Sequence, residues 1–223
     1  MLLRLAFLVA LTPAALQAAE PKDTLEQRLK ACVVCHGEHG EGLTKAEFYP
    51  RLAGKPAEYL FNQLVAFRDG RRRNPIMNYL VAYLSDEYLR EIGQYYSRLT
   101  PPYPAPTPAR PQLAARGQAL ATKGDPARKI PACTSCHGAP PYGMLPAVPG
   151  LVGLSGHYIA SQMGAWRIGQ RRAFEPDCMR AIAERLTPED VGAISAWLGS
   201  LPASTGGKPL PAGALDMPLK CGK

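Results

Sequence analysis

Beyond its first residues, the chain has no hydrophobic run that approaches the ~20 apolar residues needed for a membrane-spanning helix. It also has no segment in which apolar and polar residues alternate as in a β-strand, so helices are favoured. Its basic residues are not interleaved with aromatic ones, which argues against a nucleic-acid-binding surface. Histidine is scarce, with 4 in 223 residues, so few imidazole ligands are available.

The first 19 residues have the pattern of a secretory signal. Arg4 supplies a positive charge, residues 5–11 are apolar, and the segment ends in small residues near Ala18 and Ala19. The apolar run is too short to span a bilayer, and the alternative is an uncleaved N-terminal anchor. We therefore expect cleavage near residues 18–19 and a soluble, periplasmic mature chain.

Positive charge is concentrated in the second half of the chain. The formal net charge is +8; residues 20–100 carry 12 Lys/Arg and 11 Asp/Glu, whereas residues 101–223 carry 13 and 7. Such a surface favours acidic partner proteins or anionic lipid headgroups. The plain alternative is a solvated surface with an excess of arginine.

The pattern Cys-x-x-Cys-His occurs twice, at Cys32–His36 and Cys133–His137. This pentapeptide is the attachment motif of c-type haem. Two thiols three residues apart can form thioethers to the two vinyl groups of one porphyrin, and the following His can bind its iron. We therefore predict two covalent haems c, held by Cys32 and Cys35 and by Cys133 and Cys136. Covalent haem is attached outside the cytoplasm in bacteria, which agrees with the signal segment.

Zinc and a redox dithiol are the alternatives to haem. Four cysteines could form a Cys₄ zinc site, but zinc does not require a His after each second Cys. A redox Cys-x-x-Cys usually follows a strand, and no strand-like run precedes either motif.

The two halves of the chain repeat each other. Measured from Pro50 and Pro149, the offsets of seven further residues are identical. The matched pairs are Leu52 and Leu151, Gly54 and Gly153, Tyr59 and Tyr158, Gln63 and Gln162, Phe67 and Trp166, Arg68 and Arg167, and Gly70 and Gly169. We infer two homologous domains, residues 20–100 and 112–201.

A linker of residues 101–111 and a tail of residues 202–223 complete this organisation. Six prolines between Thr100 and Pro111 favour an extended, semi-rigid linker. The tail is rich in proline and glycine and is expected to wrap irregularly over the second domain. Apolar spacing predicts helices over residues 25–31, 56–69, 113–122 and 155–168, and capping signals predict two more after Ser85 and Thr187.

His36 and His137 are the expected proximal iron ligands. Met77 and Met179 are the expected distal ligands, because each follows an Arg-rich, irregular segment at a matching place in the repeat. His39 and His157 are not repeated and are read as solvated, Met163 as core, and Met144 and Met217 as weaker rivals. The carbonyls of Pro50 and Pro149 are expected to accept a hydrogen bond from the other nitrogen of each His.

His/Met ligation raises the iron potential and leaves no vacant coordination position. This favours electron transfer over oxygen or peroxide chemistry, and a dihaem peroxidase is disfavoured. We expect the two haems to face each other, with their edges separated by roughly one side-chain layer, ~10 Å.

The repeated pattern Cys-x-x-Cys-His-Gly, Pro-x-Leu-x-Gly, Tyr-(Leu/Ile)-x-x-Gln and an Arg-rich segment ending in Met resembles the cytochrome c4 family of dihaem class I cytochromes c. The resemblance implies an all-α fold of two tandem class I cytochrome c domains, each wrapped around one haem c. It implies a soluble or loosely membrane-attached, non-enzymatic electron carrier, without a small-molecule substrate, between a bc1-type complex and a terminal oxidase. The alternative is a cytochrome subunit of a dehydrogenase, such as a flavocytochrome c sulfide dehydrogenase.

Two cysteines, Cys178 and Cys221, remain after haem attachment, in a compartment expected to be oxidising. We predict a disulfide between them that holds the tail against the segment carrying Met179. Two unrelated free thiols are the alternative.

Overall fold

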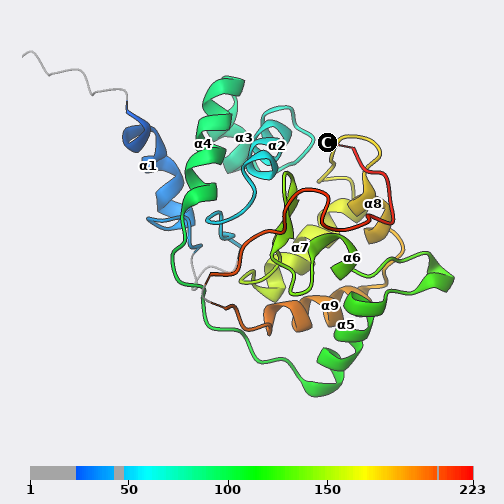
Figure 1. Ribbon diagram of the computed structural model, residues 1–223. Coiled ribbons are helices and arrows are strands. Elements are labelled where there is room, and N and C mark those ends of the chain that lie inside the picture. The colour runs from blue at the N-terminus through cyan, green and yellow to red at the C-terminus, as the bar shows by residue number, and fades with distance from the viewer. Residues whose placement is uncertain (1–23, 43–47, 205, 223) are drawn as a thin grey trace, which may run out of the picture.

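The computed structural model describes residues 24–42, 48–204 and 206–222, so the expected signal of residues 1–19 lies outside them. Two helical units lie side by side, each with its own hydrophobic core (Figure 1). No helix among the described residues has the length and apolar character needed to cross a membrane.

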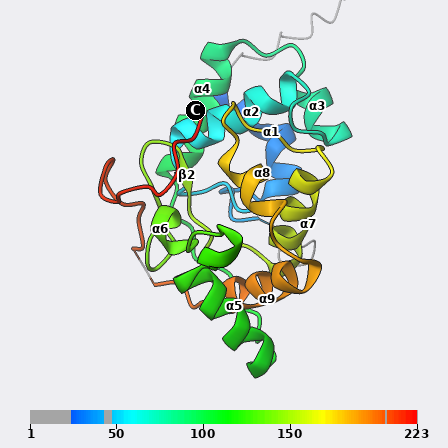
Figure 2. The same ribbon diagram turned by 90° about the vertical axis from the view of Figure 1, so that its right-hand side faces the viewer.

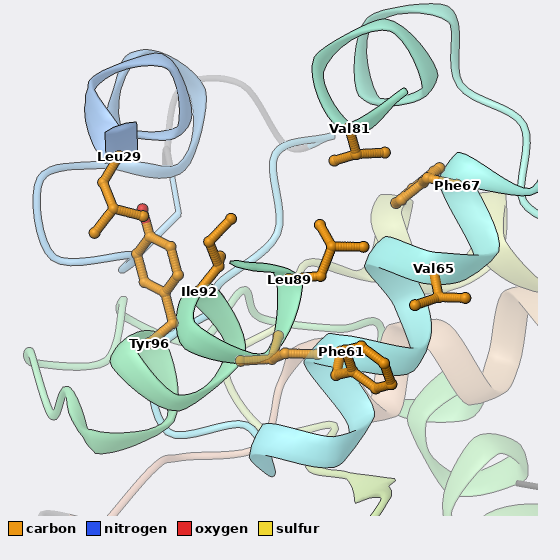
Figure 3. Packing of buried hydrophobic residues seen from close by; sticks show 9 residues of the cluster. Leu29, Phe61, Val65, Phe67, Val81, Leu89, Ile92 and Tyr96 are labelled. Carbon is orange, nitrogen blue, oxygen red and sulfur yellow. The ribbon is translucent and has the colours of Figure 1, made fainter. Parts of the chain in front are cut away.

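The first unit is built from four helices in the described residues. They are α1 (Leu25–His36), α2 (Ala57–Arg68), α3 (Pro75–Val81) and α4 (Asp86–Arg98). Ser85 caps α4 as expected, since its hydroxyl accepts a hydrogen bond from the amide of Tyr88 at 3.3 Å. Figure 3 shows the core between these helices, in which Leu89 and Tyr96 are almost fully buried.

The second unit is more elaborate. Its described elements are α5 (Pro111–Lys123), a 3₁₀ turn (Pro126–Arg128), α6 (Thr134–His137), β1 (Gly143–Met144), β2 (Val148–Pro149), α7 (Gly156–Arg167), α8 (Cys178–Ala183) and α9 (Pro188–Gly199). The described residues are mostly helical, as the all-α expectation requires, and the antiparallel pair β1–β2 is a small addition. Its strands have two residues each, which is too short for an alternating pattern to be visible in the sequence.

The structure moves several expected boundaries. The first predicted helix continues beyond residue 31 to His36, so the first Cys-x-x-Cys-His motif forms the end of α1. The second motif lies on the separate helix α6, because the chain turns at Gly124 (φ 69°) and Lys129 (φ 55°). The linker ends one residue earlier than expected, since α5 begins at Pro111.

The Arg-rich residues 71–74 and 170–177 are irregular as expected, but Met77 and Met179 themselves lie on short helices, α3 and α8, and not on loops. Asn74 and Asp177 cap these helices through their side-chain oxygens. Pro75 occupies the first turn of α3. These are ordinary helix-start signals, and the preceding arginines obscured them.

The Pro-rich linker has no regular secondary structure and is bound to both units. Arg51 of the first unit donates hydrogen bonds to the carbonyls of Pro101 at 2.6 Å and Pro102 at 2.9 Å. The amide of Thr107 donates to the carbonyl of Gly199 at the end of α9, at 2.9 Å. The linker is therefore hydrogen-bonded to both units and is not a free spacer.

The tail wraps over the second unit, as Figure 1 shows in red. The amide of Leu210 donates to the carbonyl of Gly143, and its carbonyl accepts from the amide of Leu145, both at 2.8 Å. The hydroxyl of Tyr142 accepts from the amide of Ser204 at 2.7 Å. These bonds extend the small sheet.

Asp190 holds the start of α9 in place. Its side chain is fully buried, completes a capping box with Thr187, and pairs with Arg116 at 2.7 Å and Arg128 at 2.6 Å. Burial alone would raise the pKa of this carboxyl, but the two guanidinium groups outweigh it and hold the pKa well below its usual range. One buried carboxylate thus joins α9 to α5 and to the 3₁₀ turn.

Helices α5 and α9 make the closest helix contact of the second unit, and both views show them together (Figure 2). At Gly117 the helices approach so closely that a Cβ atom would overlap the carbonyl group of Ala193. The exposed Gly192 of α9 has open space where a Cβ would lie.

We expect Gly117→Ala to lower the free energy of unfolding by about 1–3 kcal/mol, because the backbone of α9 must move to admit the methyl group. The matched control Gly192→Ala should raise it by about 0.5–1 kcal/mol through helix propensity alone. Chemical denaturation followed by circular dichroism measures both. Equal effects of the two changes would contradict close packing at Gly117.

Candidate functional site

His36 lies at the end of α1 and is 8% exposed. Its Nδ1 donates a hydrogen bond to the carbonyl of Pro50 at 2.9 Å. Because a carbonyl only accepts, the proton is on Nδ1 and Nε2 keeps its lone pair. Burial lowers the pKa of His36, with a smaller contribution from Arg72, so the neutral imidazole is favoured. A neutral imidazole with a free Nε2 is a metal-binding form.

His137 has the same environment in the second unit. Its ring is 7% exposed, and Nδ1 donates to the carbonyl of Pro149 on β2 at 2.8 Å. Burial lowers the pKa of His137, and the positive charge of Lys55 from the first unit adds to this effect. Each unit therefore presents one oriented, neutral imidazole.

Two thiols accompany each imidazole. All four cysteines are unbonded and half-buried: Cys32, Cys35, Cys133 and Cys136. Burial raises the pKa of the Cys133 thiol to about 11. The described residues contain no group of three or more His, Cys, Asp or Glu side chains placed to hold a metal ion.

Met77 and Met179 pack at the edges of the two cores. Each lies within the first turn of its helix, α3 or α8. Asn78 ties α3 to the end of α2, since its Nδ2 donates to the carbonyls of Phe67 at 2.5 Å and Arg72 at 2.9 Å. Each unit thus places one thioether on a short helix held by its own hydrogen bonds.

The remaining candidates lie elsewhere. His39 and His157 are exposed, and Met163 is buried in the second core. Met144 lies on β1, which pairs with the strand that holds the acceptor of His137. Met217 lies in the tail.

The structure joins Cys178 and Cys221 by a disulfide, with their Cα atoms 5.4 Å apart. Cys178 is the first residue of α8 and precedes Met179. The amide of Gly222 donates to the carbonyl of Pro176 at 2.9 Å, beside the bridge. The end of the tail is therefore attached to the helix that carries the second thioether.

A buried polar network between the units was not predicted from the sequence. Arg72 and Arg171 occupy equivalent positions in the repeat and are 9% and 5% exposed. Their guanidinium groups converge on two repeated side chains, Gln63 and Gln162, at 2.7–3.0 Å. Counting offsets two residues beyond Gly70 and Gly169 would have paired these arginines.

The network continues along the backbone and into two tyrosines. Arg72 donates to the hydroxyl of Tyr158 at 2.9 Å, and Arg171 donates to the hydroxyl of Tyr59 at 3.2 Å. The adjoining segments pair antiparallel, through Arg73 N to Gln170 O and Arg172 N to Arg71 O, both at 2.8 Å. The contacts obey an approximate two-fold symmetry because both partners come from the same repeated segment.

The two buried guanidinium groups have no carboxylate partner among the described residues. The buried Nε1 of Trp166 and hydroxyl of Tyr96 also have no hydrogen-bond partner there. Buried charges are normally compensated and buried polar atoms normally bonded. A group with an apolar ring and anionic edges fits both needs. Haem, with its porphyrin and two carboxylates, has this chemistry.

Two units, each with a thiol pair, a buried imidazole and a thioether, define a dihaem c-type cytochrome. No model of a known protein family matches the chain. A curated relative from Thiomonas intermedia, named thiosulfate dehydrogenase electron acceptor, is 40% identical over 86% of this chain and 85% of its own length. The crystal structure of reduced cytochrome c4 from Pseudomonas stutzeri matches with a TM-score of 0.71 and 30% identity, over 79% of this chain and 96% of the other.

A thiosulfate dehydrogenase, TsdBA, from Marichromatium purpuratum also matches, with a TM-score of 0.68 and 34% identity. The match covers 77% of this chain but only 36% of that longer one. The chain belongs to the cytochrome c4 family. It is an electron carrier with two covalently bound haems c and is not itself an enzyme.

We expect Cys221→Ser to lower the free energy of unfolding by about 3–4 kcal/mol, because the bridge closes a long loop in the unfolded chain. It should also increase amide hydrogen exchange in α8 and leave α3 unchanged. The neighbouring exposed change Lys220→Ser, which keeps the bridge, is the control. Alkylation of two thiols in the non-reduced native protein, detected by intact mass, would contradict the bridge.

Proposed function

We propose that Cys32 and Cys35 attach the first haem, with His36 and Met77 as its axial ligands. The second haem is attached by Cys133 and Cys136, with His137 and Met179 as its axial ligands. Each haem supplies an iron that exchanges one electron. The observations that support this assignment are the orientation of each imidazole by a proline carbonyl and the matching place of the two thioethers.

The protein residues that would hold each haem are themselves held in place by hydrogen bonds. The carbonyls of Pro50 and Pro149 fix the imidazole rings and keep the proton on Nδ1. The caps of α3 and α8 fix the starts of the helices that carry the two methionines. With one imidazole and one thioether from each unit, bound haem would have no vacant position for oxygen and would be suited to electron transfer.

Met77→Ala and Met179→Ala should each reduce the methionine–iron charge-transfer band of the oxidised protein by about half, since each removes one of two thioether ligands. Met163→Ala, which truncates a buried methionine outside the ligand set, should leave the band in place. An undiminished band in either ligand variant would disprove the assignment for that haem.

We infer that this carrier works in the periplasm, between a respiratory electron donor and a terminal oxidase. The candidate electron donors are a bc1-type complex and a thiosulfate-oxidising dehydrogenase. The 40% identical relative named as the acceptor of thiosulfate dehydrogenase favours the dehydrogenase. The network of Arg72 and Arg171 supports electron exchange between the haems, because it holds the two haem-binding units in one fixed arrangement.

Stopped-flow spectroscopy tests the donor. The oxidised cytochrome is mixed with thiosulfate and a thiosulfate dehydrogenase, or with quinol and a bc1 complex, and reduction of both haems is followed. We expect rapid reduction by the dehydrogenase, and omission of thiosulfate is the control. If only the bc1 complex reduced the cytochrome rapidly, the bc1 complex would be favoured as the donor. Reduction by neither enzyme would reject both donors.

A further inference from the structure

Lys55 of the first unit reaches into the second. Its side chain is 6% exposed, and its Nζ donates a hydrogen bond to the carbonyl of Gly150 at 2.5 Å. Gly150 directly follows Pro149, whose carbonyl accepts the hydrogen bond from His137. A cation from one unit therefore lies beside the segment that orients the imidazole of the other.

Packing alone does not account for a lysine at this place. Its counterpart in the repeat is Leu154, which packs against the core of the second unit. Lys55 has no carboxylate partner among the described residues, and Arg51 nearby is also positive. Burial, with help from Arg51, lowers the pKa of Lys55 to about 7. Burying a cation without an anion is unfavourable, so a leucine here would favour stability.

We propose that Lys55 is a positioning residue through which the first unit raises the reduction potential of the second haem. Oxidation adds a positive charge at the iron, and a nearby buried ammonium group makes that addition less favourable. The same ammonium group restrains Gly150 and so the acceptor of His137, which is how groups behind a metal ligand tune the metal. The proposal rests on the proposed role of His137 as an axial ligand.

The contribution from across the boundary is one-sided, because Leu154 carries no charge toward the segment that orients His36. That imidazole instead has cations of its own unit nearby, since Arg51 directly follows Pro50 and Arg72 lowers the pKa of His36. The two sites therefore receive positive charge from different groups. A difference between the two midpoint potentials places a single electron preferentially on the haem with the higher potential.

The test is spectroelectrochemical titration of the two-haem protein at pH 6, where Lys55 carries its charge because its pKa is about 7. Lys55→Met keeps the length of the side chain and removes its charge, and Lys55→Leu copies the counterpart residue. We expect both to lower one of the two midpoint potentials by about 59 mV, a tenfold change in the reduction equilibrium of a one-electron couple. Lys123→Met removes the same charge from an exposed position on α5 and should shift neither potential.

The midpoint potential that shifts in the two Lys55 variants must be the one that also shifts in Met179→Ala. Unchanged potentials, equal shifts of both, or a shift of the other haem alone would overturn the role of Lys55. Failure of the ligand proposal is seen separately, because the charge-transfer band would then persist in Met179→Ala.

Discussion

The arrangement of this molecule depends on the pairing of two arginines, Arg72 and Arg171, at the boundary between its units. Each guanidinium donates to side chains of both units, and the backbone segments on either side pair as a short antiparallel ladder. Two like charges that are buried together repel each other, and this repulsion is unfavourable for stability. Two neutral residues at the same boundary would not repel each other. Among the described residues both guanidinium groups are bound by neutral side chains only, so the carboxylates of bound haem would suit this boundary.

Because the boundary is polar and directional, it sets one orientation of the units. Apolar surfaces can slide over one another, whereas hydrogen bonds from a planar guanidinium have fixed directions. The linker agrees with this orientation, since Arg51 binds its carbonyls and Thr107 binds the end of α9. Lys55 is the asymmetric element in an otherwise two-fold contact. The two haem sites therefore share a design and differ in their electrostatic surroundings.

Much of the candidate site could be predicted from the sequence because the repeat supplied two independent copies of each feature. The Cys-x-x-Cys-His motifs name the thiols and imidazoles, and the Arg-rich segments that follow Gly70 and Gly169 point to Met77 and Met179. Repetition could not reveal Lys55, which has no polar counterpart in the second unit. The short helices α3 and α8 escaped notice because runs of arginine resemble an irregular segment, although Asn74 and Asp177 carry the capping signals.

The sequence by itself determined the cofactor chemistry, the two-unit organisation and most helices, because covalent attachment and helix capping depend on residues close together in the chain. Tertiary structure alone decided what lies between the units. Arg72 meets Tyr158, and Lys55 meets Gly150, only when residues 86 and 95 positions apart are brought together by folding. Such contacts leave no local pattern, since their geometry depends on how two complete units pack. The disulfide that attaches the tail to α8 spans 43 positions but was predictable, because Cys178 and Cys221 are the two cysteines left after haem attachment.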